Sequence, residues 1–219
     1  MQMYGVTQFA IRRAFGGLEE LVPIVQSMVD HYPLIPAWRC GLAFLYRELG
    51  WVENARTEFE ILAANDFTDI PMDANWKVGI AILSTVCNML GEVECAQRLY
   101  EMLAPYANLI VTAGMPADIL TSVHLPLGLL AATLERWDEM EFHMTEAAIR
   151  NQAFGLRPWT AVVRLEHATI LAKRNQSGDA EHARELLKLC RKEASELRMT
   201  RIIGLADALA DRLVGHGSP

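Results

Sequence analysis

Acidic and histidine side chains spaced four residues apart are the first candidates for chemistry in this chain of 219 residues. Glu139 precedes His143 at this spacing and Glu141 precedes Thr145, so each pair would share one face of a helix. Glutamate and histidine can bind zinc in this way, but the chain has no His-Glu-x-x-His motif and the sequence suggests no third ligand nearby. We therefore expect an exposed helix face with a weak contact between neighbouring turns, and no metal.

Other reactive side chains are isolated along the sequence. His124 lies in an apolar stretch beside Pro126, and we expect a buried or partly buried histidine rather than a proton shuttle. The chain lacks the Gly-x-Ser-x-Gly and Ser-x-x-Lys strings of common nucleophiles and the phosphate-binding P-loop motif. The cysteines form no Cys-x-x-Cys pair and are expected to be small buried side chains: Cys40, Cys87, Cys95 and Cys190. The sequence therefore predicts no catalytic residue and no cofactor.

Composition excludes several classes of protein. Hydrophobic residues make up 52% of the chain and the net charge is −7, without a basic stripe, which argues against binding nucleic acid. The longest apolar run, residues 119–134, is interrupted by His124, Pro126 and Gly128 and is too short to span a bilayer. The start lacks the features of a secretory signal. We expect a cytoplasmic protein with no membrane association.

One short pattern occurs five times and indicates helical repeats. A residue that ends a helix is followed, five and nine residues later, by an apolar pair. The five breaks lie 34, 41, 44 and 43 residues apart, which is close to the period of helix-hairpin repeats. The copies are Gly16 with Leu21 and Val25, Gly50 with Ala55 and Phe59, Gly91 with Ala96 and Tyr100, Glu135 with Met140 and Met144, and Gly178 with Ala183 and Leu187.

These elements predict an all-α fold. We expect one domain over residues 1–214, a right-handed α-solenoid of about five tetratricopeptide-like hairpins with a C-terminal capping helix. Pro126 falls inside one predicted helix, 117–134, and should kink it because proline removes a backbone donor. The hairpins are expected at 3–31, 35–64, 73–106, 117–154 and 158–197, the terminal helix at 200–214 and a disordered tail at 215–219.

Several strings resemble a known family. They are Tyr32-Pro33-Leu34-Ile35-Pro36-Ala37-Trp38-Arg39, Asp73-Ala74-Asn75-Trp76, Leu103-Ala104-Pro105-Tyr106-Ala107, Leu127-Gly128-Leu129-Leu130-Ala131-Ala132-Thr133-Leu134 with Arg136-Trp137-Asp138-Glu139, and Ala153-Phe154-Gly155-Leu156-Arg157-Pro158-Trp159-Thr160. In this order they resemble the C-terminal helical-repeat region of large bacterial signalling ATPases, many of which carry a nucleotide cyclase or a LuxR-type DNA-binding domain. The resemblance covers roughly residues 8–200, and Glu135 stands where the family usually has glycine.

The resemblance implies a non-catalytic interaction or sensor module of a bacterial signal-transduction or transcription regulator. Such a module would bind a protein partner or an effector and influence an attached output domain. In tetratricopeptide-like solenoids the first helix of each hairpin lines a concave groove. The groove would suit an apolar or amphipathic segment of a protein partner, or of the protein's own ATPase or output domain. The predicted groove residues are Cys40, Phe44, Arg47, Ala81, Thr85, Asn88, Leu125, Leu129 and Ala132.

Two other classes of function stay open. The apolar face of residues 201–214 could cap the last hairpin or bridge two chains, and the second option would make the protein a homo-oligomeric scaffold. A stand-alone helical enzyme would need acid, base or nucleophilic side chains converging in a pocket, and the sequence indicates no such set.

Overall fold

The computed structural model describes residues 2–113 and 118–215, and it is mostly helical, at 77%. Eleven α-helices, packed in sequence order, one pair of short strands and two short 3-10 helices, Leu18–Leu21 and Ala104–Tyr106, account for its regular structure within these residues. The helices and strands are α1 (Gln2–Phe15), α2 (Val22–His31), α3 (Pro36–Leu49), α4 (Val52–Ala63), α5 (Trp76–Leu90), α6 (Val93–Leu103), β1 (Ile110–Ala113), β2 (Asp118–Ser122), α7 (His124–Thr133), α8 (Trp137–Ala153), α9 (Arg157–Arg174), α10 (Asp179–Glu196) and α11 (Thr200–Gly215). No helix in this part of the chain is long and apolar enough to cross a membrane.

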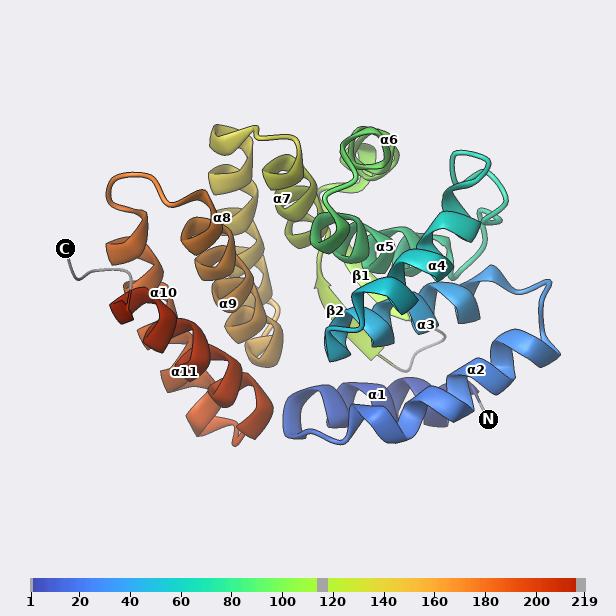
Figure 1. The fold of residues 1–219 in the computed structure, drawn as a ribbon, viewed down its shortest axis with the longest axis horizontal. Coiled ribbons are helices and arrows are strands. Elements are labelled where there is room, and N and C mark those ends of the chain that lie inside the picture. The colour runs from blue at the N-terminus through green and yellow to red at the C-terminus, as the bar shows by residue number, and fades with distance from the viewer. Residues whose placement is uncertain (1, 114–117, 216–219) are drawn as a thin grey trace.

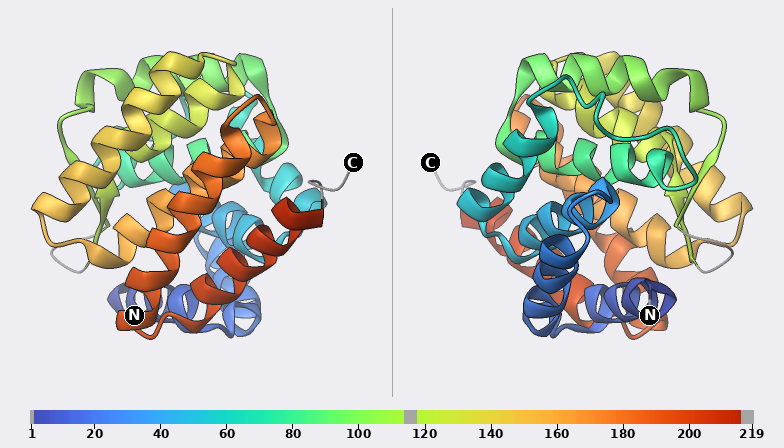
Figure 2. Two further views of the ribbon diagram at one scale, coloured as in Figure 1. Left: turned by 90° about the vertical axis from the view of Figure 1, so that its left-hand side faces the viewer. Right: turned by 90° about the vertical axis from the view of Figure 1, so that its right-hand side faces the viewer.

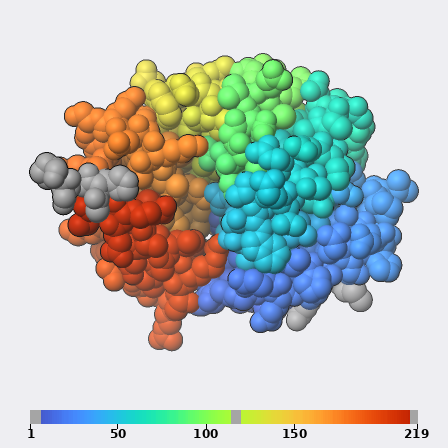
Figure 3. Space-filling view, viewed as in Figure 1, coloured from blue at the N-terminus to red at the C-terminus, as the bar shows by residue number. Residues whose placement is uncertain are grey.

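Successive helices pack as antiparallel pairs in chain order. Helices α3 and α4, α5 and α6, α7 and α8, and α9 and α10 contact one another as hairpins, and α3, α5 and α7 lie side by side (Figure 1). The row bends round until α1 meets α11, so the first and last helices are in contact. Figure 3 shows the N-terminal segment against the C-terminal one along the lower edge of the molecule. The helices therefore form a closed ring around a shared interior.

The repeated pattern of the sequence marks the turn inside each hairpin and the core that follows it. All five break residues have a positive φ: Gly16, Gly50, Gly91, Glu135 and Gly178. At four of the breaks this left-handed conformation follows the end of the first helix, whereas α9 ends at Arg174 with Asn175 as its left-handed cap and Gly178 directly precedes α10. Glycine adopts this conformation at little cost. The apolar pairs that follow are core residues, since eight of the ten side chains are buried: Leu21, Ala55, Phe59, Ala96, Met140, Met144, Ala183 and Leu187.

The fourth hairpin departs from the predicted one. We expected a helix from residue 117, but β1 and β2 pair as an antiparallel hairpin with an irregularity between Ile110 and Thr112, and α7 begins only at His124. The predicted kink at Pro126 is also wrong. Pro126 is the third residue of α7, in the first turn, where backbone N–H groups have no partner within the helix. The absent donor of proline therefore disturbs no hydrogen bond there.

Helix α11 covers the end of the last hairpin. It packs against α10 and α9, with Ile202, Ala206 and Leu209 buried. The left-hand view of Figure 2 shows α10 and α11 running beside one another. The helix extends to Gly215, one residue beyond its predicted end, and the rest of the predicted tail, 216–219, lies outside the described residues. This packing is the one expected of a cap.

An ion-pair cluster inside the ring joins its two ends. The carboxylate of Glu48, on α3, is almost fully buried and contacts three guanidinium groups. Arg13 of α1 lies 3.1 Å from it, Arg47 of α3 lies 2.6 Å away and Arg201 of α11 lies 3.0 Å away. Arg201 also donates hydrogen bonds to the backbone carbonyl oxygens of Glu48 and Arg13, at 2.6 and 3.2 Å. Glu48 therefore connects the first and last helices.

Burial raises the pKa of the Glu48 carboxyl, but the three arginines outweigh this effect and hold the pKa well below its usual range. Arg47 also donates to Glu166 of α9 at 2.6 Å, which brings a fourth helix into the cluster. Removing one partner from such a buried group leaves the others without compensation, at a cost of several kcal/mol. The cluster thus joins the two ends of the ring through buried charges, beside the direct contact of α1 with α11.

The strained turn at Glu135 gives a first prediction. A side chain in the left-handed region costs roughly 1–2 kcal/mol that glycine does not, and Glu135 is exposed with φ at 56°. Glu135→Gly should therefore raise the free energy of unfolding in urea by about 1 kcal/mol. The reverse change at the equivalent turn, Gly91→Ala, should lower it by a similar amount. Equal stabilities for the Glu135→Gly variant and the parent would contradict the strain argument.

The cluster around Glu48 gives a second prediction. Glu48→Gln keeps the volume but removes the charge that three guanidinium groups share, and we expect a loss of about 3–5 kcal/mol in urea unfolding at neutral pH. Glu60→Gln is the control, because Glu60 is exposed and lies 4.0 Å from Arg56, and it should change stability by less than about 0.5 kcal/mol.

The effect of Glu48 should depend on pH with a definite sign. Because its pKa is lower in the folded state, the unfolded chain takes up the proton first as pH falls below about 4.5, the ordinary value. The stability that Glu48 contributes is complete above that pH and is lost in acid. The difference between the parent and Glu48→Gln should therefore shrink as pH falls from 5 to 3. A constant difference across that range would contradict the charge-based account.

Candidate functional site

The nine predicted groove residues lie on α3, α5 and α7. Five of the nine are buried: Cys40, Phe44, Ala81, Leu125 and Leu129. Arg47, Thr85, Asn88 and Ala132 are half-buried. Arg47 is held by Glu48 and Glu166, and Asn88 donates to the backbone oxygen of Leu129 and the hydroxyl of Thr133, both at 3.0 Å. Arg47 and Asn88 therefore already bind neighbouring helices, and the hydroxyl of Thr85 donates to Ile82 within α5.

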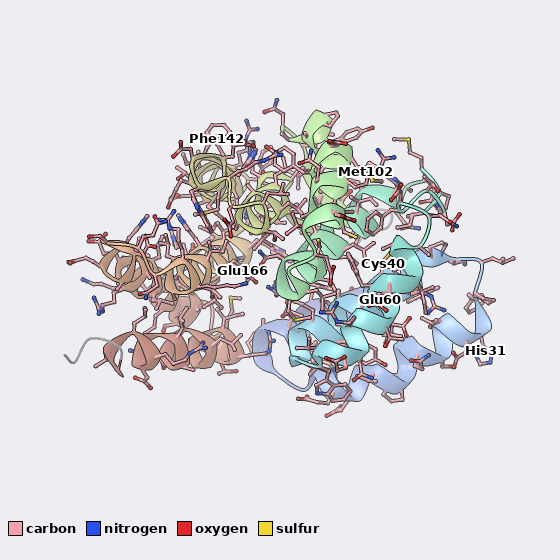
Figure 4. All side chains as sticks on the ribbon, turned by 45° about the horizontal axis from the view of Figure 1, so that its top comes forward. His31, Cys40, Glu60, Met102, Phe142 and Glu166 are labelled. Atoms are coloured by element: carbon pink, nitrogen blue, oxygen red, sulfur yellow. The ribbon has the colours of Figure 1, made fainter. Side chains whose placement is uncertain are left out.

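A small interior hollow brings part of this set together. Phe44, Ala81, Thr85, Leu125 and Leu129 line it, with Arg13, Trp159 and Glu166. The guanidinium of Arg13 lies 4.5 Å from the ring centre of Trp159 and 5.5 Å from that of Phe44. Figure 4 shows Glu166 near the middle of the molecule, whereas Phe142 and His31 lie at its edge. A side chain of the protein's own N-terminal helix, Arg13, thus reaches into the space where a groove was predicted.

The cysteines are free thiols within the core, as the sequence predicts. Cys40, Cys87 and Cys190 are buried and Cys95 is half-buried. Burial raises the pKa of Cys40 and of Cys190 to about 12, and it raises the pKa of Cys87 as well. A thiol with such a pKa is protonated at neutral pH and is a poor nucleophile. These side chains are packing residues.

A chain of hydrogen bonds runs inward from Glu139. The hydroxyl of Tyr100, on α6, donates to Glu139 at 2.7 Å and lies 2.9 Å from Nε2 of His143. Nδ1 of His143 lies 2.8 Å from Nδ1 of His124. Because the single phenolic proton goes to Glu139, Nε2 of His143 must donate to Tyr100, and His124 must donate to His143. Nε2 of His124 is then a buried acceptor without a partner.

His124 and His143, the two histidines of this hydrogen-bond chain, are buried and neutral. Glu139 is exposed as expected, but His143 is only 6% exposed, so the expectation of an exposed face is wrong for His143, whose ring meets Tyr100 of α6 and His124 of α7. Burial, followed by the neighbouring His124, lowers the pKa of His143 to about 4. Burial and then Arg150 lower the pKa of His124. Neither histidine lines the interior hollow, so the arrangement fits a structural network.

A second polar cluster lies on three consecutive helices. Nε2 of His167, on α9, lies 2.9 Å from Oε2 of Glu141, on α8. His182, on α10, is exposed and meets the ring of His167 edge-on, with 5.1 Å between ring centres. One ligand atom from each of the three side chains lies within 4.8 Å of the other two. This set has the ligand types and the proximity of a metal site.

The surroundings of Glu141 fix its orientation. Arg174 lies 3.3 Å from Oε1 of Glu141 and binds both carboxylate oxygens of Asp179, at 2.9 and 2.6 Å. The guanidinium also lies 5.3 Å from the ring centre of Trp137. A hydrogen bond from His167 lowers the pKa of Glu141, although partial burial acts in the other direction. Glu141 is therefore an ionised carboxylate with one oxygen turned toward the histidines.

The sequence did not reveal this cluster. Glu141 was noted only for its spacing to Thr145, and His167 and His182 lie 26 and 41 residues further along the chain. Such intervals correspond to no local motif, because they are set by the lengths of the helices and the turns between them. The signal that was available was one histidine in each helix of the fifth predicted hairpin.

An apolar hollow lies on the outer surface where two connections between hairpins meet. The α2–α3 connection contributes Leu34 and Ile35, and the α4–α5 connection contributes Ile70 and Pro71. Leu34 is 92% exposed, and Met72, which follows Pro71 in the α4–α5 connection, is 72% exposed. Both connections lie at the right-hand side of Figure 1.

Comparison of the chain with protein-family profiles, with curated proteins and with solved structures found no match.

The buried hydrogen-bond chain gives a third prediction. Tyr100→Phe removes the acceptor of His143 Nε2 and leaves a buried donor without a partner, which costs about 1–3 kcal/mol in unfolding free energy. Tyr32→Phe is the control, because Tyr32 is 51% exposed, and it should change stability by less than about 0.5 kcal/mol. Equal effects of the two substitutions in urea titrations would argue against the network.

Proposed function

We propose that this chain is a non-catalytic helical-repeat interaction module of a bacterial signalling regulator. It would bind a protein partner, or an ATPase or output domain of the same regulator, and influence the attached output. The finer fold proposal is a right-handed α-solenoid of tetratricopeptide-like hairpins, curved until its ends meet. Five break residues with positive φ and the buried pairs that follow them support that proposal.

The observation that carries the function is the apolar hollow between the α2–α3 and α4–α5 connections. Leu34 lines this hollow and is 92% exposed, and an exposed apolar patch is typical of an interaction surface. Two of the strings that carry the family resemblance, 32–39 and 73–76, contribute to this hollow or adjoin it. We place the partner contact here, on the rim of the ring, rather than on its occupied interior.

The chemistry of the hollow indicates the kind of partner. Its lining is mainly aliphatic, with Asp73 and Asn75 at one side as polar groups. An apolar side chain presented by a helix or loop would fill the hollow, and its polar neighbours would meet the carboxylate and amide. A small anionic effector is disfavoured, because no lysine or arginine lines this surface.

One observation bears on the alternative function, that of an oligomeric scaffold. Leu205 and Val214 of α11 remain exposed although the helix covers the last hairpin, so a second chain could still pack there. Sedimentation of the parent and of Leu205→Glu separates this case, since a scaffold would change from dimer to monomer. The enzyme alternative would require a substrate path to His124, whose Nε2 is buried.

The proposed function predicts a site-specific contact in cells. A photo-crosslinking amino acid at Leu34 should give one discrete covalent product with another protein, or with another domain of the same polypeptide. The same amino acid at Lys188, an exposed position on α10, should not give that product. Leu34→Glu should weaken co-purification of the identified partner at least tenfold while leaving thermal stability unchanged. If the products at positions 34 and 188 are the same, the hollow is not the contact.

A further inference from the structure

We propose that Glu141, His167 and His182 bind a divalent transition-metal ion of the Zn²⁺ class at the junction of the fourth and fifth hairpins. The proposal is independent of the interaction surface described above. It rests on the ligand types, their separation, the residues that orient them and the access of solvent to the site.

The ligand types select the class of metal. Two imidazoles and one carboxylate suit zinc and its neighbours in the first transition series, whereas calcium and magnesium favour oxygen ligands alone. Three protein ligands leave a fourth position for water, the arrangement found in catalytic zinc sites. His182 is exposed, so this position would face solvent.

The separation of the ligand atoms is close to that of a bound site. Tetrahedral zinc with bonds of 2.0–2.1 Å would set its ligand atoms about 3.3 Å apart. Oε2 of Glu141 and Nε2 of His167 are already 2.9 Å apart, and all three ligand atoms lie within 4.8 Å of one another. The exposed side chain of His182 can close the remaining distance by rotating, without moving a helix.

Neighbouring residues hold the ligands in place. Arg174 binds Oε1 of Glu141 and leaves Oε2 for the metal. Both oxygens of Asp179 bind Arg174, so an anionic partner offsets its positive charge. Outer residues that orient a ligand in this way commonly change metal affinity by 10- to 100-fold. His167 is buried, which limits the freedom of its ring before the metal arrives.

Metal binding would connect two hairpins. Glu141 belongs to α8 of the fourth hairpin, and His167 and His182 belong to the two helices of the fifth. In binding, the proton on His167 Nε2 moves to Nδ1 or to solvent, and the metal replaces its hydrogen bond to Glu141. A ligand that binds only the folded state stabilises it by mass action.

The test uses the full chain, prepared without a polyhistidine tag and dialysed against a chelator. Co²⁺ titration should produce a visible absorption band that saturates at one ion per chain, and Zn²⁺ should displace it. A hundredfold excess of Zn²⁺ over its Kd should raise the melting temperature by roughly 5 °C or more. The absence of both the absorption band and the shift in melting temperature would overturn the proposal.

Matched variants distinguish this site from other binding. His182→Ala removes an exposed ligand, should leave the fold intact by circular dichroism and should weaken Zn²⁺ binding at least tenfold. Glu141→Gln should weaken it similarly, and neither variant should keep the full thermal shift. His31→Ala removes an exposed histidine on α2 and should bind Zn²⁺ as the parent does. Equal affinity of His182→Ala and the parent would also overturn the proposal.

Discussion

The buried carboxylate of Glu48 is the constraint on which the rest of the structure depends. An ionised carboxylate can leave water only if enough compensating charge surrounds it, and here the charges come from Arg13, Arg47 and Arg201. These residues belong to α1, α3 and α11. The two ends of the helix row therefore meet at this carboxylate, where the three guanidinium groups converge.

Most of the helices could be predicted from the sequence because each hairpin carries its own local signal. The breaks at Gly50 and Gly91 adopt the positive φ that ends a helix, Gly178 adopts it just before α10 begins, and most of the apolar side chains that follow the breaks are buried. The strand pair before α7 was missed because a short apolar run reads alike as a buried strand or a helix. Because β2 was predicted as part of a helix, Pro126 was expected to interrupt that helix, whereas α7 starts only two residues before it.

Closure of the ring and the side-chain clusters could not be predicted in this way. The sequence identified Arg47 as the only cation of the inner face, but nothing near it indicates a partner such as Glu166, 119 residues away. Spacing of four residues correctly placed Glu139 and His143 on one turn of α8, yet their common partner is Tyr100 of a different hairpin. Glu141, His167 and His182 likewise meet only because α8, α9 and α10 are adjacent. Local patterns indicate faces of helices, and tertiary packing decides what those faces meet.

The contact between the ends of the chain also bears on how the molecule folds. Thr200 donates to the backbone oxygen of Phe15 and Arg201 to that of Arg13, across separations of 185 and 188 residues. A linear array of repeats has only nearest-neighbour contacts, so it can form from any point and lose repeats from its ends one by one. Here some contacting residues are separated in sequence by nearly the whole length of the chain. Such contacts raise the contact order, and they form only after the long intervening segment has closed into a loop. The two ends must therefore assemble together, and unravelling of either one releases the other.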